Sequence, residues 1–212
     1  MEKSKLPVFY LNIDENIIDS GVSAISFVDT PATTEEWYKF NKLNDHNRLL
    51  FVTTEEKRII TGPVMLAETE ILRFSDIIGY YKVKFSESTI LKMVIKYFKE
   101  NKIHNVNEDH NSDKQVNGVY MVESYIVGDN VKSMLYKDVK KGSWIASFYI
   151  SDEEYWEELK SKDFTGFSLE GKFIEQYEKD LVEQMYNGVV DILSSDISDD
   201  EKEIKIKSIL NV

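Results

Sequence analysis

Short runs rich in β-branched and aromatic residues recur along most of the chain, several of them with alternating hydrophobic and polar positions. Such runs are typical of β-strands. Gly62 and Pro63 interrupt one run, and proline lacks the amide donor of a ladder, so we expect a bulge, kink or edge there. The predicted strands are residues 8–13, 23–28, 58–67, 79–85, 119–127, 143–150 and 165–173.

The helical period is clearest in residues 86–102, where apolar side chains recur every three or four positions and predict a core-facing stripe. A short acidic helix is predicted at residues 152–162, and another helix begins near Thr33. Residues 41–47 and 105–117 are polar without a period, which predicts loops. The stripe of the first helix consists of Ile90, Leu91, Val94, Ile95 and Phe98.

The last 38 residues differ in character from the rest of the chain. Residues 175–212 hold ten acidic and four basic side chains, which is half of the formal net charge of −12. Apolar residues at Leu181, Met185, Val189 and Leu193 allow an amphipathic helix. We therefore predict a body, residues 1–174, and an acidic, helical C-terminal appendage, residues 175–212. This appendage could dock on a basic partner.

Composition excludes several functional classes. The 42% hydrophobic content of the 212 residues supports a packed core. The acidic balance disfavours nucleic-acid and anionic-membrane binding, and the absence of cysteine excludes thiol nucleophiles and disulfides. We expect a soluble intracellular protein without cofactor or metal. No glycine cluster forms a phosphate-binding loop, and His46, His104 and His110 fit no compact metal motif.

A serine between two nearby glycines is the sharpest candidate for chemistry. Ser168 lies in Gly166-Phe167-Ser168-Leu169-Glu170-Gly171, and a serine nucleophile needs a histidine base and a group that orients the base. His110, in a polar segment, could be that base. Glu123 shares a strand face with Met121 and Tyr125, where a carboxylate needs a partner, so it could hold His110. The alternative is an ordinary strand serine, a solvated histidine and a solvated Glu123.

Seven segments of the chain contain most of these predicted strands and the candidate site residues. They are GVSAISFVDTPA (21–32), RIITGPVMLAETEILR (58–73), YYKVKFSESTI (80–90), NVNEDH (105–110), VESYIV (122–127), GSWIASFYI (142–150) and FTGFSLEGKF (164–173). In this order they resemble the XkdF-like prohead proteases of tailed phages, relatives of the wider phage-prohead and herpesvirus-assemblin serine proteases. The resemblance covers residues 20 to 174.

The resemblance implies a mixed α/β (α+β) fold with a barrel-like, largely antiparallel sheet and surrounding helices. It also implies a serine endopeptidase of capsid maturation, with Ser168 as nucleophile and His110 as base. For the third member we rank Glu123 first, Glu170 second and Asp109 third. Because no arginine follows Arg73, oxyanion stabilisation would come from backbone N–H groups, a lysine such as Lys172, or water.

The same resemblance implies where such an enzyme acts. Its partners would be the scaffold protein and the major capsid protein, whose extensions it would cleave in the host cytoplasm, inside the immature phage head. A homo-oligomer is compatible with this setting, and nucleic acid and membrane are not expected partners. The alternative from another class is a catalytically inactive head-assembly scaffold protein that retains the protease fold.

Overall fold

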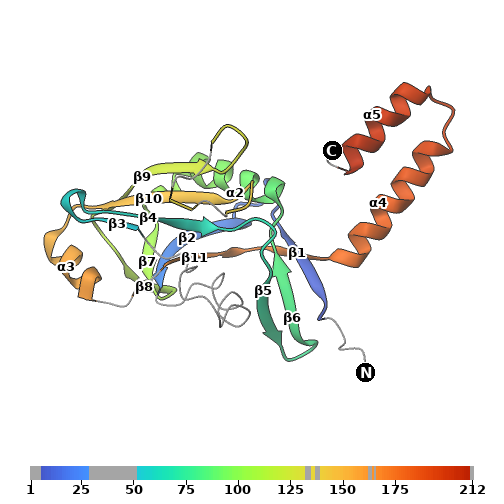
Figure 1. Ribbon diagram of the computed structural model, residues 1–212. Helices are drawn as coiled ribbons and strands as arrows, with labels where there is room; N and C mark the ends of the chain where they lie inside the picture. The colour runs from blue at the N-terminus through green and yellow to red at the C-terminus, as the bar shows by residue number, and fades with distance from the viewer. Residues whose placement is uncertain are drawn as a thin grey trace, which may run out of the picture.

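The computed structural model describes residues 6–28, 52–131, 135–136, 139–161, 164 and 166–210. The fold is mixed α/β, with three four-stranded sheets and four α-helices in this part of the chain (Figure 1). The helix predicted near Thr33, the loop at 41–47 and His46 lie outside the described residues. None of the three sheets closes into a barrel in the described ranges, which differs from the barrel-like sheet that the resemblance implied.

Each sheet contains strands from distant parts of the sequence. Sheet A has the order β12 (Ile174–Tyr177), β1 (Val8–Asn12), β6 (Gly79–Lys84), β5 (Ile71–Ser75). Sheet B has the order β11 (Gly166–Lys172), β2 (Gly21–Val28), β7 (Val106–Glu108), β8 (Asn111–Gln115). Sheet C has the order β3 (Val52–Thr54), β4 (Ile59–Met65), β10 (Trp144–Ile150), β9 (Val119–Ile126). Pairing is antiparallel except between β1 and β6 and between β2 and β7, so the largely antiparallel character is confirmed.

The helices connect or cover these sheets. The α-helices are α2 (Glu87–Lys99), α3 (Glu153–Ser161), α4 (Glu178–Leu193) and α5 (Asp199–Leu210), and short 3₁₀ helices span Glu55–Lys57 and Lys102–His104. All seven predicted strands are present within one or two residues of the predicted bounds, as is the helix predicted at 152–162. The helix predicted at 86–102 is also present, but it ends three residues earlier, at Lys99. The loop predicted at 105–117 is wrong, because it contains the β7–β8 hairpin.

Strand β4 carries the irregularity that its proline predicts. The pairing of β10 with β4 shifts register between Trp144 and Ile145, which lie opposite Met65 and Pro63. The extra residue on β4 is therefore Val64, directly after the proline. A bulge at this point accommodates the missing amide donor within an otherwise buried strand.

Helix α2 buries a different face from the stripe that hydropathy predicts. Ser86 caps the helix, and its hydroxyl accepts the backbone N–H of Thr89. Of the predicted stripe, Leu91, Ile95 and Phe98 are largely exposed. The buried face instead contains Thr89, Ile90, Met93, Lys96 and Tyr97. The helix is therefore rotated toward a face that includes a lysine.

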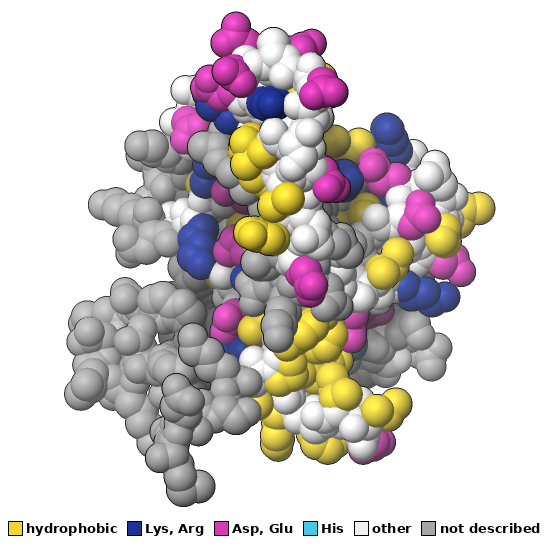
Figure 2. Space-filling model, turned by 90° about the vertical axis from the view of Figure 1, so that its right-hand side faces the viewer, with side chains coloured by type: hydrophobic (Ala, Val, Ile, Leu, Met, Phe, Trp, Pro, Cys, Tyr) yellow, Lys and Arg dark blue, Asp and Glu magenta, His cyan; other side chains and the backbone are white. Residues whose placement is uncertain are grey.

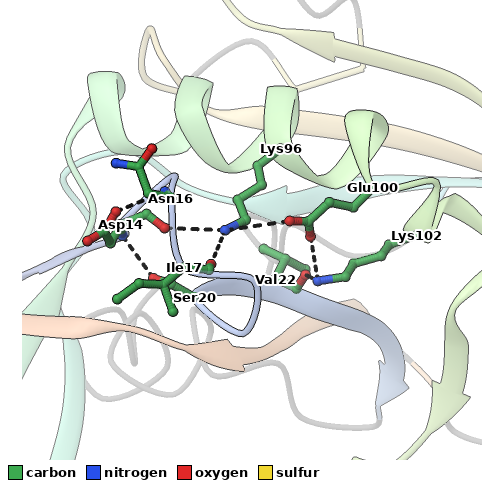
Figure 3. Close-up of polar contacts among 8 residues, drawn as sticks. All are labelled: Asp14, Asn16, Ile17, Ser20, Val22, Lys96, Glu100 and Lys102. Carbon is green, nitrogen blue, oxygen red and sulfur yellow. Dashed lines mark hydrogen bonds and ion pairs between the residues drawn. The ribbon is translucent and has the colours of Figure 1, made fainter.

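Lys96 is buried because carbonyl and carboxylate oxygens surround its ammonium group (Figure 3). Its Nζ donates to the carbonyl oxygens of Asp14, at 3.2 Å, and Ile17, and pairs with Glu100 Oε1 at 3.5 Å. Glu100 Oε2 in turn lies 2.7 Å from Lys102 Nζ. These contacts attach the β1–β2 connection to α2, so the cluster fixes the start of β2.

We expect Glu100→Gln to lower the free energy of unfolding at pH 7 by about 1–3 kcal/mol, because it removes a hydrogen-bonded charge between two lysines. The Lys102 contact, with the charge of Lys96, holds the pKa of Glu100 below its ordinary value. A carboxylate with a lowered pKa stabilises the fold above its unfolded-state pKa, and this contribution is lost as the pH falls through the folded-state value.

The difference between wild type and Glu100→Gln should therefore shrink on acidification from about pH 4.5 downward. Urea unfolding at pH 7, 5 and 3 measures it. Glu157→Gln is the matched control, since Glu157 pairs with Lys160 on an exposed surface of α3. An undiminished difference at pH 3 would contradict this account of the cluster.

Aromatic residues join sheets B and C in the core. Phe27 of β2 and Phe167 of β11 lie opposite each other in register, and Phe148 of β10 packs against both, with ring centroids 5.0 to 6.0 Å apart. Since side chains alternate along a strand, the neighbours of Phe27 and Phe167 face the opposite side of sheet B. That side carries the candidate site.

The C-terminal helices α4 and α5 form an arm that extends from the end of β12 (Figure 1). The amphipathic helix predicted in the tail is present as α4, and a second helix, α5, follows it, although the side chains of Leu181 and Met185 lie outside what the structure describes. Figure 2 shows hydrophobic side chains along this arm and, lower on the same face, over the β5–β6 hairpin. No helix in the described ranges is long and apolar enough to cross a bilayer. The exposed apolar residues are Tyr186, Val190, Leu193 and Ile204 on the arm and Phe74, Ile77, Ile78 and Tyr80 on the hairpin.

Strand β12 extends past the domain boundary that the composition predicts. Residues 174–177 pair with β1, Tyr177 packs on Phe9 with ring centroids 5.2 Å apart, and Glu175 accepts the Tyr81 hydroxyl at 3.0 Å. We expect a chain that ends at Tyr177 to keep its thermal midpoint within a few degrees of the full chain. A chain that ends at residue 173 should lose at least about 2 kcal/mol, because both contacts disappear.

Thermal unfolding of the two truncated chains beside the full chain measures this difference. Unfolding of the chain that ends at Tyr177 would show that α4 is part of the fold of the body. Equal stability of the two truncated chains would show that β12 contributes nothing.

Candidate active site

A polar cluster occupies the face of sheet B that lies opposite the aromatic core. In register, Ser26 of β2 lies between Ser168 of β11 and Asn107 of β7. Glu170 follows Ser168 by two residues, so it projects from the same face of β11. Four residues of this face and of the adjoining turn make direct contacts, and we call them the polar cluster: Ser26, Asn107, His110 and Glu170.

The hydroxyl of Ser26 is the centre of the polar cluster. Its Oγ lies 2.5 Å from Asn107 Oδ1 and 2.8 Å from Glu170 Oε1. It also lies 3.2 Å from His110 Nδ1. Asn107 Nδ2 donates to Glu170 Oε1 at 2.6 Å, and the same oxygen lies 3.4 Å from His110 Nδ1. Glu170 Oε1 is thus in contact with an amide, a hydroxyl and an imidazole.

The donor count assigns a role to each ring nitrogen of His110. The Ser26 hydroxyl has only one proton to donate, although Asn107 Oδ1 and Glu170 Oε1 both lie within hydrogen-bond distance. Glu170 as a carboxylate can only accept hydrogen bonds. A proton on Nδ1 of His110 satisfies both neighbouring oxygens. The other nitrogen, Nε2, then carries a lone pair and can accept a proton, which is the arrangement of a histidine base oriented by an acid.

A tight turn positions His110. Glu108 and Asn111 pair across the β7–β8 hairpin, so Asp109 and His110 form its two-residue loop. Both have positive φ, 49° and 57°, as a type I′ turn requires. Left-handed backbone is uncommon in non-glycine residues and is concentrated at functional sites. The turn places the histidine beside β2, although its ring remains partly exposed.

The structure does not bring Glu123, the first-ranked acid, to His110. Glu123 is on β9 of sheet C, and its Oε2 accepts the Ser147 hydroxyl at 2.7 Å. Ser147 also contacts Thr61 at 2.8 Å, so this carboxylate belongs to a separate hydrogen-bond chain. The carboxylate that contacts His110 is Glu170, which the sequence ranked second. Asp109, ranked third, donates its backbone N–H to Phe27 and adjoins His110 only through the turn.

Ser168 lies directly opposite Ser26 in the β11–β2 pair. Cα atoms at such paired positions are about 4.5–5.5 Å apart, so the two serines are immediate neighbours. Ser26 is 0% exposed and Ser168 8% exposed, and Ser168 also lines a cavity. Lys172, a candidate for oxyanion stabilisation, ends the strand and pairs with Asp19 at 3.4 Å on the surface.

The glycine after the candidate nucleophile allows two backbones to approach closely. A Cβ built on Gly171 would lie 2.2 Å from the carbonyl oxygen of Gly21. The register of β11 on β2 also shifts between Glu170 and Gly171. A residue with a side chain at position 171 could therefore not keep this close approach of β11 to β2. The pairing that aligns Ser168 and Glu170 with β2 depends on it.

Sequence reasoning missed Ser26 and Asn107. Serine is an ordinary residue on a strand, and nothing around Ser26 distinguishes it from other strand serines. Asn107 lies three residues before His110 in NVNEDH, a segment whose polar pattern predicts a loop. Recognition of a hairpin there would have placed Asn107 on a strand. In the described ranges, no group of three or more acidic or histidine side chains is arranged to hold a metal ion.

Comparison with known proteins adds family evidence to this geometry. The chain is 26% identical over 170 residues to "Uncharacterized protein YqbD" of Bacillus subtilis (strain 168), and the match covers 77% of this chain. The chain spans about half the length of that relative, since the match covers 48% of it. No solved structure matches the chain. A family model described as "Putative phage serine protease XkdF" matches residues 47–178, which include His110, Ser168 and Glu170. Because this match covers more than half of the sequence, the chain belongs to the XkdF family of phage proteins.

Proposed function

We propose that the chain is a serine endopeptidase with Ser168 as nucleophile, His110 as general base and Glu170 as the orienting acid. One observation carries the proposal: Glu170 Oε1 lies 3.4 Å from His110 Nδ1, on the strand that bears Ser168 two residues earlier. The proposed nucleophile and acid therefore share one face of one strand, and the acid contacts the histidine. The family description, a phage serine protease, supports the same reaction class.

The reaction follows from these roles. His110 Nε2 takes the proton of the Ser168 hydroxyl while Oγ forms a bond to the scissile carbonyl carbon. The tetrahedral intermediate collapses, the C–N bond breaks, and His110 gives its proton to the leaving amine. Water then attacks the acyl-enzyme while His110 accepts its proton; the bond to Ser168 Oγ breaks, His110 returns the proton to that oxygen, and the new carboxyl terminus is released. Glu170 stays ionised throughout and stabilises the imidazolium form of His110.

Two observations favour Ser168 over Ser26 as the nucleophile. Ser26 is completely buried, whereas Ser168 lines a cavity and retains some exposure. Ser26 also lies outside residues 47–178, the part that the family model matches. We assign Ser26 and Asn107 as positioning residues, since both contact Glu170 Oε1 and Ser26 also contacts His110.

Oxyanion stabilisation is proposed to come from backbone N–H groups. Lys172 pairs with Asp19 at an exposed site and does not reach the polar cluster in this arrangement. Strand β11 lies at the edge of sheet B, so one of its two edges has no strand partner within the described sheet. Backbone N–H groups on an unpaired edge can donate to a developing oxyanion, which is the usual way to stabilise it.

The proposed substrates are extensions of the scaffold protein or of the major capsid protein, cleaved inside the immature phage head. Confinement in a closed shell raises the local concentration of enzyme and substrate, so modest affinity would suffice. The alternative is a head-assembly protein that retains the fold without catalysis. The low exposure of Ser168 is the observation that favours this alternative.

A reactive-serine probe tests the assignment without knowledge of the substrate. We expect a fluorophosphonate to form a covalent adduct on Ser168 of the full chain, located by peptide mass spectrometry. His110→Ala should suppress the adduct, because an unactivated hydroxyl reacts slowly. His104→Ala is the matched control, since His104 packs against Tyr120, with ring centroids 6.0 Å apart, and takes no part in the polar cluster. No adduct, or an adduct that does not depend on His110, would favour the non-catalytic alternative.

A further inference from the structure

The second half of α4 carries a line of large apolar side chains that remain exposed. We call Tyr186, Val190 and Leu193 the α4 stripe; they are 69%, 41% and 58% exposed. Because an α-helix turns about 100° per residue, the three side chains lie within about 60° of its circumference. Gaps of four and three residues are also the spacing of positions d, a and d of a heptad, which is typical of a helix face that packs on another helix.

The α4 stripe faces away from α5. Gly188 of α4 lies against Ile209 of α5, since a Cβ built on Gly188 would be 3.1 Å from Ile209 Cδ1. Gly188 lies about 200° around the helix from Tyr186, which is nearly the opposite side. Helix α5 therefore covers the other face of α4 and leaves the stripe on the surface of the arm, where Figure 2 shows hydrophobic side chains.

The arm also carries a surplus of negative charge. Residues 178–210 contain nine acidic and four basic side chains, a net charge of −5. Among the acidic side chains of the arm that the structure describes, Glu203 alone pairs with a base, Lys207 at 2.5 Å. Of the others, Glu183 lies one turn before Tyr186, and Asp191 directly follows Val190. The surface is therefore apolar along the stripe and anionic around it.

We propose that the α4 stripe binds a basic amphipathic helix of another protein. Aliphatic side chains of that helix would pack on the stripe, and its lysine or arginine side chains would lie near the carboxylates of the arm. A second copy of this chain fits less well, because each copy carries a net charge of −12. The β5–β6 hairpin, the other exposed apolar surface, supplies no positive surplus, since residues 68–84 hold three acidic and three basic side chains.

This surface is separate from the candidate active site. The family model ends at residue 178, the first residue of α4, so nearly all of the arm lies outside the part that holds His110, Ser168 and Glu170. The inference goes beyond the proposed function and does not depend on it. If the bound partner also carries a substrate segment, attachment to the arm would raise the concentration of that segment near the body of the same chain.

Fluorescence anisotropy with a synthetic peptide tests the surface on the full chain. The probe is a fluorescein-labelled two-heptad peptide with leucine at positions a and d and lysine elsewhere. One control peptide has glutamate in place of every lysine, and the other has the composition of the probe in an order without a helical stripe. We expect the probe to bind at least about 10-fold tighter than either control, because the probe alone matches both the stripe and the charge. Its binding should weaken as the salt concentration rises.

A pair of polar substitutions locates the binding surface. Val190→Gln with Leu193→Gln leaves the charge unchanged and should weaken binding of the probe at least about 10-fold. Ile77→Gln with Ile78→Gln is the matched control, because these side chains are 92% and 48% exposed on the β5–β6 hairpin, and the affinity should remain within about two-fold. If the first pair lowers the helix content measured by circular dichroism, Tyr186→Gln alone takes its place with the same expected direction.

The charge of the arm is tested by a second pair. Glu183→Gln with Asp191→Asn should weaken binding of the probe several-fold and reduce its dependence on salt. Asp76→Asn with Glu154→Gln is the matched control, since it changes the net charge equally at exposed positions of the body. We expect a smaller effect from this control pair.

The outcomes identify the occupant. Equal binding of the probe and the reordered peptide, or undiminished binding after Val190→Gln with Leu193→Gln, overturns the inference. It is also overturned if the full chain sediments as a dimer that this pair dissociates, or binds phosphatidylcholine vesicles in a way that this pair abolishes. Tighter binding of the probe that depends on both the α4 stripe and the carboxylates of the arm supports it, whether or not the fluorophosphonate adduct forms.

Discussion

Ser168→Ala is expected to reduce cleavage of the head proteins by a factor of about 10³ or more while the chain remains folded. The substitution removes the hydroxyl that would form the acyl-enzyme, and it deletes only one oxygen from a strand side chain. Co-expression with scaffold and capsid proteins, followed by mass spectrometry of new peptide termini, measures the effect. Thermal unfolding of the purified variant should agree with wild type to within a few degrees.

Ser26→Ala is the matched control for this substitution, because it removes the same group from the directly opposite position. We expect a smaller loss, since Ser26 contacts His110 and Glu170 and would only position them. Abolition of cleavage by Ser26→Ala, with cleavage retained in Ser168→Ala, would make Ser26 the nucleophile. Retention of cleavage in both variants would remove both serines from the chemistry.

Glu170→Gln is expected to lower kcat/KM by about 10² to 10⁴, the range that follows when the orienting carboxylate of a triad becomes an amide. The amide keeps the size of the side chain but offers an N–H where His110 Nδ1 needs an acceptor. The imidazolium form also loses its counter-charge. Steady-state cleavage of a labelled peptide derived from the processed head protein measures the loss.

Glu123→Gln is the matched control for the acid. Glu123 accepts a hydrogen bond from Ser147, and a glutamine carbonyl can accept the same bond, so we expect activity within a few-fold of wild type. This expectation reverses the ranking that the sequence alone supplied. A large loss in Glu123→Gln with a small loss in Glu170→Gln would restore that ranking.

The strands could be predicted where one face is apolar, because alternation then leaves a clear pattern in the sequence. Hydropathy failed for β7 and β8, whose segment from Asn105 to Asn117 is almost entirely polar. It failed for the buried face of α2 for a related reason. Lys96 is buried through bonds to the carbonyl oxygens of Asp14 and Ile17, and no residue scale contains partners that come from another part of the chain.

The candidate site could be predicted only in part, because it also depends on contacts between distant parts of the chain. The sequence predicts Ser168 as a serine between two nearby glycines. It predicts His110 as a histidine in one of the segments that resemble the phage proteases. The acid could not be chosen, because Glu123 and Glu170 both lie in segments that the pattern predicts as strands. Only the pairing of β11 with β2 and of β9 with β10 decides which carboxylate faces the histidine. Sheet register is a non-local property, and single-sequence patterns do not encode it.

The position of β11 in the chain has a consequence for the timing of activity during synthesis. Ser26 and Glu170 are in contact although 144 residues separate them in sequence. A nascent chain that has emerged only as far as His110 holds the base but neither the proposed nucleophile nor the acid. Both arrive together on one strand, and a one-residue slip of that strand would turn both away. Under the proposed assignment, proteolysis therefore begins only after β11 has docked on β2, and a nascent chain that does not yet include β11 is protected from cutting itself or its neighbours.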